Sequence, residues 1–327
     1  MKVYLGIDGG GTSTRVVAAE EGGRVVGVGR GGASNPYEGG IDLATRSVRE
    51  AAEAALKQAG VAMDAVVATF AGTAGVVGAE DQALARDVMS QAGIRGRLGV
   101  DHDIRIALAG GLAGAEGMAL IVGTGSSCYG RTADGKTCQS GGWGSILDDG
   151  GSAFGLGMSA MQAAVRVADG RFPPSPVLAG VLEGFGLTEI RQIVKKVYQT
   201  GVTKTEVGQL APAVIKAWEG GDKVATEIVA NGVRELVLIV MNAAERLDLL
   251  KKTVRVSTSG GLIENSATYR ERVYGALREA LPAGAEVGAA KMAPVLGAVL
   301  LAYEEAGIKH DDRVHDVLLR SYTEMLR

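Results

Sequence analysis

The sequences VYLGIDGGGTST (residues 3–14) and ALIVGTGSSCYG (residues 119–130) share one layout. Each begins as a short apolar run, typical of a buried β-strand, and then breaks into a turn rich in glycine and hydroxyl side chains. Glycines let the backbone approach an anion closely, and successive N–H groups in such a turn can bind phosphate oxygens. A third apolar run, TVRVSTSGG at 253–261, also ends in glycines. Three such turns favour phosphate binding over plain hairpin turns.

Strands alternate with helices outward from these turns. In the first half we expect strands over 2–8, 14–20, 24–31, 65–70 and 96–103, and helices over 41–59, 79–92 and 104–114. From Gly117 the order strand, glycine turn, strand and hairpin is repeated, and the hairpin over 127–144 turns at Asp134-Gly135. Further helices are expected over 188–199, 203–219, 222–248, 262–280 and 292–307. The pattern predicts α/β layers built by a structural duplication.

The totals restrict the class of protein. The chain has 327 residues, which is room for two domains, and 46% hydrophobic residues, which is enough for sizeable cores. A net charge of −3 argues against nucleic acid or a membrane surface as the main partner. Because the sequence has no apolar stretch of about 18 residues and no signal-peptide layout, we expect a cytoplasmic enzyme.

The two cysteines, Cys128 and Cys138, lack metal-site spacing and are expected to be reduced. A turn centred on Asp134-Gly135 would place Cys138 opposite Arg131, which argues against a disulfide across the hairpin.

Asp8 gives the first turn a specific chemistry, because it lies at the end of a buried strand directly before the glycines. A carboxylate beside a phosphate nest needs a cation, and Mg²⁺ binds one or two carboxylates together with substrate phosphates. The turn is neither a Walker A loop nor a dinucleotide-binding fingerprint.

Five segments, in order, resemble the N-acetylglucosamine kinases of the BadF/BadG/BcrA/BcrD-type branch of the actin, hexokinase and heat-shock 70 superfamily. They are GIDGGGTST, GVDHDIRIALAGG, IVGTGSSCYG, SGGWGSILDDGGSAFG and STSGGL. The resemblance covers residues 1–307 and implies two ribonuclease H-like (actin-like ATPase) domains, with ATP and sugar in the interdomain cleft. The expected domains are 1–115, completed by a C-terminal helical segment at about 292–327, and 116–291 with a helical insertion.

The resemblance also implies roles for individual residues, with ATP and Mg²⁺ as cofactors and a homodimer as the assembly. Asp8 would order Mg²⁺ through water. The ATP-binding residues would be Asp8, Gly9, Gly10, Gly11, Thr12, Ser13, Thr14, Gly123, Thr124, Gly125, Ser126, Gly260 and Gly261. The sugar-binding residues would be Asn35, Asp103, Thr124, Trp143, Gly144 and Asp149.

Asp103 matches the general base of the family, and its position supports that role independently. Phosphoryl transfer to a sugar hydroxyl needs a carboxylate that takes the proton. Asp103 is expected to start a helix, where the dipole keeps a carboxylate ionised. A helix cap without chemistry is the alternative. We expect Asp101 to be a solvated neighbour and His102 to be structural.

The sequence departs from the family after the GGWG segment, where the family usually has two acids before Gly-Ser. Here the run is Asp148-Asp149-Gly150-Gly151-Ser152. We favour Asp149 as the sugar ligand because that alignment keeps the register with Gly151-Ser152. The preferred sugar stays open between N-acetylglucosamine, phosphorylated on its 6-hydroxyl, and glucosamine, N-acetylmuramate or glucose.

Two functions of other classes remain as alternatives. One is an activator ATPase of a CoA-dehydratase-like system, which would need cysteines for an iron–sulfur cluster. The other is a sugar-sensing regulator, which the start of the phosphate strand at residue 2 makes a poor fit.

Overall fold

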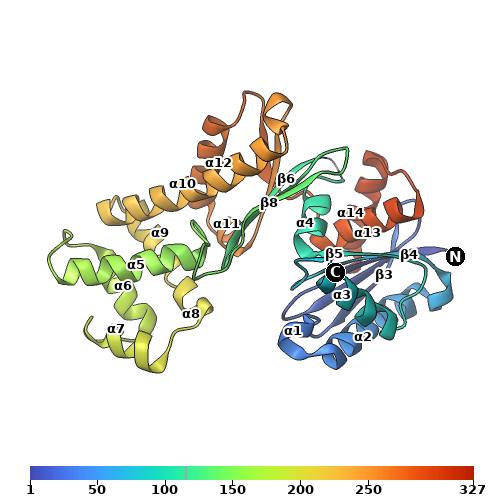
Figure 1. Ribbon diagram of the computed structural model, residues 1–327, viewed down its shortest axis with the longest axis horizontal. Helices are drawn as coiled ribbons and strands as arrows, with labels where there is room; N and C mark the ends of the chain where they lie inside the picture. The colour runs from blue at the N-terminus through green and yellow to red at the C-terminus, as the bar shows by residue number, and fades with distance from the viewer. Residues whose placement is uncertain (115) are drawn as a thin grey trace. The chain divides into compact units, whose positions relative to one another are not determined.

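The computed structural model describes residues 1–114 and 116–327. Two compact units are present, Met1–Glu116 with Ala290–Arg327, and Gly117–Ala289. Each contains a five-stranded mixed sheet, with strand orders β3-β2-β1-β4-β5 and β8-β7-β6-β9-β10. In both sheets three consecutive strands form an antiparallel meander. A fourth strand pairs in parallel with the first strand of the meander, and a fifth pairs in parallel with the fourth. The predicted α/β class and the duplication are confirmed (Figure 1).

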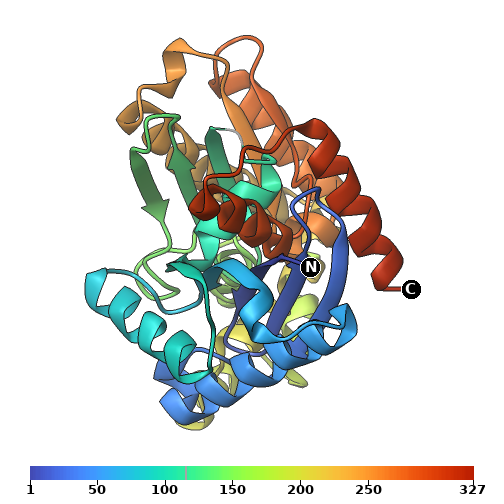
Figure 2. The same cartoon turned by 90° about the vertical axis from the view of Figure 1, so that its right-hand side faces the viewer.

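In the N-terminal unit helices pack against both faces of the sheet. Its strands are β1 (Val3–Gly9), β2 (Thr14–Ala19), β3 (Val25–Gly31), β4 (Val66–Thr73) and β5 (Arg97–His102). Its helices are α1 (Pro36–Gly39), α2 (Ile41–Ala59), α3 (Ala79–Gln91), α4 (Asp103–Gly111), α13 (Pro294–Ala306) and α14 (Asp312–Met325), with a 3₁₀ turn at Met63–Ala65. Helices α2 and α13 cover opposite faces of the sheet (Figure 2).

Side-chain alternation along β1 explains this sandwich. Leu5 and Ile7 lie in the core formed with α2 and α3, whereas Tyr4 lies in the core formed with α13. Between them, Gly6 lets α13 approach the strand, because a Cβ there would lie 2.5 Å from the carbonyl oxygen of Val295. The close contact therefore requires glycine at this position.

The C-terminal unit adds a helical layer to its sheet. Its strands are β6 (Gly117–Val122), β7 (Ser126–Arg131), β8 (Thr137–Gly141), β9 (Arg255–Ser259) and β10 (Glu286–Ala289). Its α-helices are α5 (Ala153–Ala168), α6 (Pro176–Phe185), α7 (Gln192–Lys195), α8 (Lys204–Gly208), α9 (Ala211–Glu219), α10 (Lys223–Arg246), α11 (Gly261–Asn265) and α12 (Ala267–Ala280). Short π- and 3₁₀-helical turns occupy Lys196–Thr200 and Leu249–Lys251. One apolar core joins the sheet to these helices.

Two predicted helices are each divided in the structure. The helix expected over 203–219 is split into α8 and α9, because Pro212 in the first turn of α9 lacks an N–H to continue the earlier helix. The helix expected over 262–280 is split at Ser266, whose side chain accepts from the Tyr269 N–H and caps α12. Strand β10 was not predicted, since it is only four residues long and carries little pattern. The C-terminal helical segment expected at about 292–327 consists of two helices, α13 and α14.

The hairpin between β7 and β8 turns at the predicted place with a different register. Its loop has three residues, since the Gly135 N–H donates to the Thr132 carbonyl and the Thr132 N–H donates to the Lys136 carbonyl. Gly135 has φ +88°, as a glycine bulge requires. Cys138 therefore pairs with Gly130, so the predicted position opposite Arg131 was wrong by one residue. Both cysteines are free and buried.

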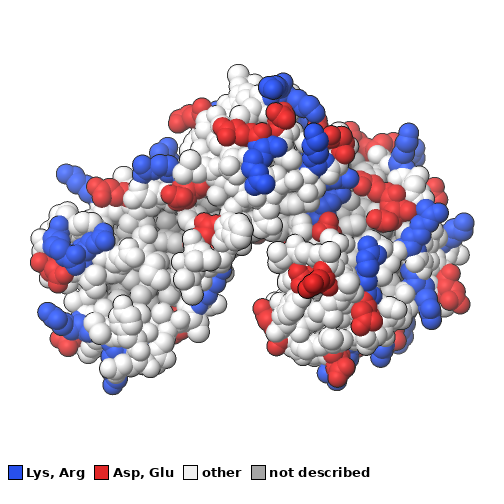
Figure 3. All heavy atoms as spheres, in the orientation of Figure 1, with Lys and Arg blue, Asp and Glu red and all other residues white. Residues whose placement is uncertain are grey.

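No helix in the described part of the chain is both long and apolar enough to cross a bilayer. Acidic and basic side chains are interspersed over the visible face of each unit (Figure 3).

Candidate active site

Three parallel strand ends bring the predicted acids of the N-terminal unit together. In the sheet register, Asp8 on β1 pairs with Gly72 on β4, and Gly72 pairs with Asp101 on β5. His102 ends β5 and Asp103 starts α4 directly after it. Because the carboxyl ends of parallel strands meet at one edge, Asp8 and Asp103 lie close enough for their charges to interact.

Burial dominates the titration of Asp8. It raises the pKa of Asp8 from 3.8 to about 6, while the Arg15 guanidinium opposes the shift and the Asp103 carboxylate adds to it. A carboxylate destabilised by burial and by a second carboxylate is a site that would gain from a cation. The part of the chain described here holds no cluster of three metal-ligating side chains, so a cation at Asp8 would take its other ligands from phosphate and water.

Backbone hydrogen bonds stabilise the first glycine turn. The Gly10 N–H donates to the Ser13 carbonyl at 3.0 Å, and the Gly10 carbonyl accepts from the Ser34 N–H at 3.0 Å. The predicted ATP residue Thr14 is buried at the start of β2, and its hydroxyl donates to the Gly32 carbonyl at 2.8 Å. Thr12 and Ser13 are exposed in the turn.

Asn35 follows Ser34, whose N–H donates to this turn. The hydroxyl groups of Ser34 and Thr73 near the turn were not predicted from the sequence. The Asn35 Oδ1 atom accepts from the Tyr37 N–H at 3.1 Å and caps α1, which is the ordinary role of Asn before Pro. The buried hydroxyls of Ser34 and Thr73 have no hydrogen-bond partner among the described residues. A Cβ on Gly9 would lie 2.6 Å from the Ser34 Oγ atom, so glycine keeps this space open. Unpaired buried hydroxyls beside a glycine turn are suited to a polar ligand.

Asp103 is the first residue of α4, as expected. Burial raises the pKa of Asp103 and outweighs the lowering by His102 and by the N–H groups at the helix start. A raised pKa suits a general base better than a fully stabilised carboxylate does. His102 caps the helix by accepting from the Arg105 N–H at 3.2 Å, and burial lowers the pKa of His102, which agrees with a structural role.

The second glycine turn joins β6 to β7 in the C-terminal unit. The Gly123 N–H donates to the Gly125 carbonyl, and the carbonyls of Gly123 and Thr124 accept from the N–H groups of Ala153 and Phe154. The start of α5 therefore holds the turn in place. The N–H groups of Thr124 and Gly125 have no partner among the described residues, as a phosphate nest requires.

Asp149 lies beneath this turn and is 2% exposed. Its Oδ1 atom accepts from the Ser126 N–H at 2.9 Å, and its Oδ2 atom pairs with the Lys204 ammonium at 2.7 Å. A direct sugar contact, as predicted for Asp149, would have to share or replace these bonds.

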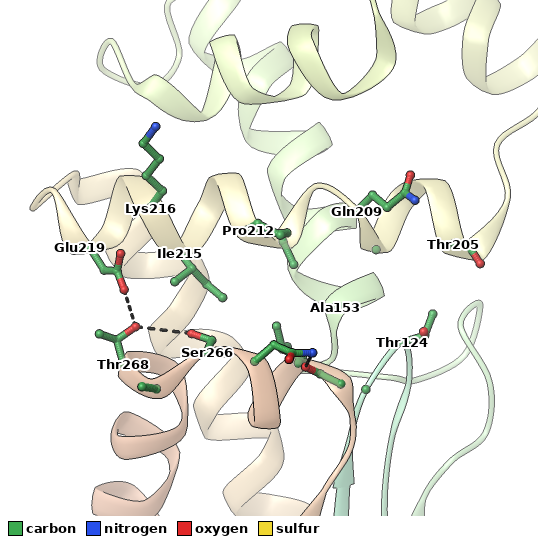
Figure 4. Close-up of a pocket in the computed structure, with 17 residues that line it drawn as sticks. Thr124, Ala153, Thr205, Gln209, Pro212, Ile215, Lys216, Glu219, Ser266 and Thr268 are labelled. Carbon is green, nitrogen blue, oxygen red and sulfur yellow. Dashed lines mark hydrogen bonds between the residues drawn. The ribbon is translucent and has the colours of Figure 1, made fainter. Parts of the chain in front are cut away.

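A cavity of about 640 Å³ opens beside the turn, and its walls were largely missed by the sequence analysis (Figure 4). Of the predicted residues it includes Gly123, Thr124 and Gly261. The other lining residues come from α5, α8, α9 and the segment 262–268: Ala153, Thr205, Gly208, Gln209, Ala211, Pro212, Ile215, Lys216, Glu219, Leu262, Asn265, Ser266, Ala267 and Thr268. The small residues of α8 and α9 were the available signal, but small residues on an amphipathic helix indicate packing just as well.

Gly260 and Gly261 lie where β9 ends next to β6. Gly260 has φ +112°, and a Cβ there would lie 2.7 Å from the Val122 backbone, so only glycine fits. The cavity therefore has glycine backbone on two neighbouring strand ends, where a flat ligand could approach closely.

Trp143 and Gly144 lie in the segment between β8 and α5. Trp143 is 75% exposed, which excludes a core role, and Ile146 and Leu147 beside it are exposed as well. Gly144 has φ +88°. Trp218, in contrast, packs against the core as expected.

Comparison with known proteins identifies the family of this chain. The model of the BadF/BadG/BcrA/BcrD ATPase family matches residues 5–302. The chain is 34% identical over 265 residues to an N-acetylmuramic acid/N-acetylglucosamine kinase from Clostridium acetobutylicum, covering 81% of this chain and 87% of that protein. It is 31% identical over 254 residues to the glucosamine kinase GspK from Vibrio cholerae, covering 76% and 84%.

Solved structures show the same fold. A protein from Chromobacterium violaceum, provisionally described as an N-acetylglucosamine kinase, superimposes with a TM-score of 0.68 at 27% identity, covering 92% of this chain and 99% of that one. A ROK family glucokinase from Streptomyces griseus, 18% identical, matches in fold with a TM-score of 0.54, covering 92% of this chain and 98% of that one. The expected resemblance is confirmed: the chain belongs to the BadF/BadG/BcrA/BcrD ATPase family.

Proposed function

We propose that this protein is an ATP-dependent kinase that phosphorylates the 6-hydroxyl of N-acetyl-D-glucosamine. The observation that carries the proposal is the placement of Asp8 and Asp103 at one sheet edge beside a glycine turn. The kinase names of the curated relatives support the reaction class, and they include both N-acetylated and free amino sugars.

The C-terminal unit is proposed to bind the nucleotide. The unpaired N–H groups of Thr124 and Gly125 would bind phosphate oxygens, and the cavity lined by Gly261 would receive the adenosine. The glycine backbone of Gly123 and Gly261 allows close approach of the ligand on this side.

The N-terminal unit is proposed to bind the sugar and the metal. Asn35 would bind sugar hydroxyls, since its Nδ2 group has no partner among the described residues. Trp143 and Gly144 are proposed as sugar-binding residues on the family resemblance alone. Asp8 would hold Mg²⁺ through water, and the ion would neutralise charge on the transferring phosphoryl group. The residues fit such an ion, because Asp8 is half-buried with a raised pKa and lies near partnerless hydroxyls.

Asp103 is proposed to accept the proton of the attacking hydroxyl. Its burial favours the neutral form that results, so proton transfer costs less than it would for an exposed carboxylate. The carboxylate would also orient the hydroxyl before transfer.

A coupled assay of ADP formation with purified protein tests the function. The panel consists of N-acetylglucosamine, glucosamine, N-acetylmuramate and glucose, and the position of phosphorylation is read by nuclear magnetic resonance. We expect the highest kcat/KM with N-acetylglucosamine and phosphate on the 6-hydroxyl. A different preferred sugar would keep the kinase class and replace the substrate, whereas no transfer to any of the four would refute the proposal.

Replacing Thr124 with valine tests the second turn. The substitution keeps the shape of the side chain and removes a hydroxyl that lines the cavity (Figure 4). We expect kcat/KM to fall by about ten- to hundredfold, as for a lost transition-state hydrogen bond, with the unfolding temperature nearly unchanged. Unchanged turnover would contradict a nucleotide site at this turn, and Thr226→Val on the exposed face of α10 serves as the matched control.

A further inference from the structure

The second glycine turn needs a support that its own backbone does not supply. The partnerless N–H groups of Thr124 and Gly125 have to point outward together, while the Ser126 N–H must be satisfied inside the unit. The Asp149 carboxylate accepts from the Ser126 N–H. It lies so close to the turn that a Cβ on Gly125 would be 2.6 Å from the Asp149 Oδ1 atom. The Asp149 carboxylate therefore supports the turn together with the two backbone hydrogen bonds from the start of α5.

The backbone around Asp149 fixes this carboxylate tightly. Asp149 has φ +69°, an uncommon conformation for a residue with a Cβ, and its carbonyl accepts from both the Ser152 N–H and the Ser152 hydroxyl. A strained residue that its surroundings hold in place is typical of a functional site.

Lys204 is the cation of this arrangement. Its Nζ atom is 2.7 Å from the Asp149 Oδ2 atom, and the Lys204 side chain is 41% exposed whereas that of Asp149 is 3% exposed. A carboxylate this deeply buried is strongly destabilised when its cation is removed. Lys204 starts α8, which has its own capping box between Thr203 and Glu206, so the helix does not depend on the lysine for its start.

The same helix reaches the cavity. Thr205, the residue after Lys204, lines the cavity together with Thr124 from the turn (Figure 4). A nucleotide in the cavity would therefore contact both α8 and the turn that α8 supports through Lys204.

We propose that Lys204 is a positioning residue of the nucleotide site: it holds the Asp149 carboxylate, which holds the Ser126 N–H and so keeps the N–H groups of Thr124 and Gly125 aligned for phosphate. The inference rests on the proposed nucleotide site. It gives Asp149 a role in supporting the phosphate turn beside the sugar contact that the family resemblance implies.

Equilibrium binding of a non-hydrolysable ATP analogue, measured by calorimetry without sugar, tests the inference directly. Lys204→Met keeps the length of the side chain and removes its charge. We expect it to weaken binding of the analogue by about ten- to hundredfold, because displaced phosphate ligands lose their alignment. Lys204→Arg should restore affinity to within a few-fold of the wild-type protein.

Two further comparisons separate positioning from other roles. Asp149→Asn alone should weaken analogue binding by about as much as Lys204→Met alone. The double variant that carries both substitutions should bind no more weakly than either single variant, since the two residues act as one unit. In steady-state kinetics KM for ATP should rise, whereas KM for the sugar should change little. Lys195→Met, on the exposed side of α7, is the matched control and should bind as the wild-type protein does.

The outcomes distinguish the inference from the proposed function. Wild-type affinity in Lys204→Met, or an effect of Asp149→Asn confined to KM for the sugar, would overturn the positioning role and leave the kinase proposal intact. Analogue binding without transfer to any sugar would refute the kinase proposal, and the comparison of the lysine variants would still test Lys204. Failure of the wild-type protein to bind the analogue would refute both.

Discussion

Replacing Asp103 with asparagine is expected to lower kcat by about 10²- to 10⁴-fold, the usual contribution of a general base. Asparagine has the same shape as aspartate and can still accept from the Ile104 N–H at the start of α4, but it cannot accept the proton of a sugar hydroxyl. Substrate binding should be largely kept, so KM for ATP should change little. Steady-state kinetics with the preferred sugar would measure both quantities.

Asp101, two residues before Asp103 and on β5, offers a control. Its Oδ1 atom accepts from the His102 N–H at 2.8 Å and from the Gln82 side chain at 3.4 Å, which are structural contacts. Asp101→Asn should therefore keep kcat within a few-fold of wild type. If Asp103→Asn also keeps more than a tenth of the wild-type kcat, Asp103 is a helix residue without a catalytic role.

The topology and the strand-end turns of this protein could be predicted because they depend on local patterns. An apolar run followed by glycines marks a strand end wherever it occurs, and the repeated order of these runs predicts the duplicated sheet. Asp8 and Asp103 could be placed at the strand ends for the same reason.

The rest of the site depends on contacts between residues that are far apart in the chain. Asp149 and Lys204 are 55 residues apart in the chain. The sequence does not indicate that the start of α8 lies next to the second glycine turn. The partnerless hydroxyls of Ser34 and Thr73 lie on different segments and share a neighbour only once the sheet is formed. The predicted register of the β7–β8 hairpin was wrong by one residue, because the glycine in the bulge shifts every residue pair that follows it.

The raised pKa of Asp103 shows that burial can outweigh the effect of a helix start on a carboxylate. A helix N-terminus stabilises a carboxylate by a modest amount at the surface, whereas removal from water acts in the opposite direction and grows with depth. The sequence shows that Asp103 starts a helix, but not how deeply that start is buried.

Replacing Asp8 with asparagine is expected to abolish most activity while stabilising the protein without ligands. Activity should fall at least about 100-fold, because the proposed metal site would lose its only charged side chain. In the absence of nucleotide and metal, the free energy of unfolding at pH 7 should rise by about 2 kcal/mol. That figure follows from a pKa raised from 3.8 to about 6, reduced for partial solvent exposure.

The pH dependence of this stabilisation gives it a specific signature. Between about pH 4 and pH 6 the folded wild-type protein binds more protons at Asp8 than the unfolded chain does, so its free energy of unfolding decreases as the pH rises through this window. The asparagine variant lacks this decrease. The difference in stability between the two proteins should therefore grow from pH 4 to pH 6 and stay constant above it, as measured by chemical denaturation.

Asp103 supplies a second test of the same electrostatics, because its charge contributes to the raised pKa of Asp8. In an Asp103→Asn background the pKa of Asp8 should be lower, so Asp8→Asn should stabilise that variant by less than it stabilises the wild-type protein. Asp64→Asn, at an exposed position, serves as the control substitution. A stability difference for Asp8→Asn that is flat from pH 4 to pH 7, or a variant that keeps wild-type turnover, would show that Asp8 is not the buried, cation-binding carboxylate of this site.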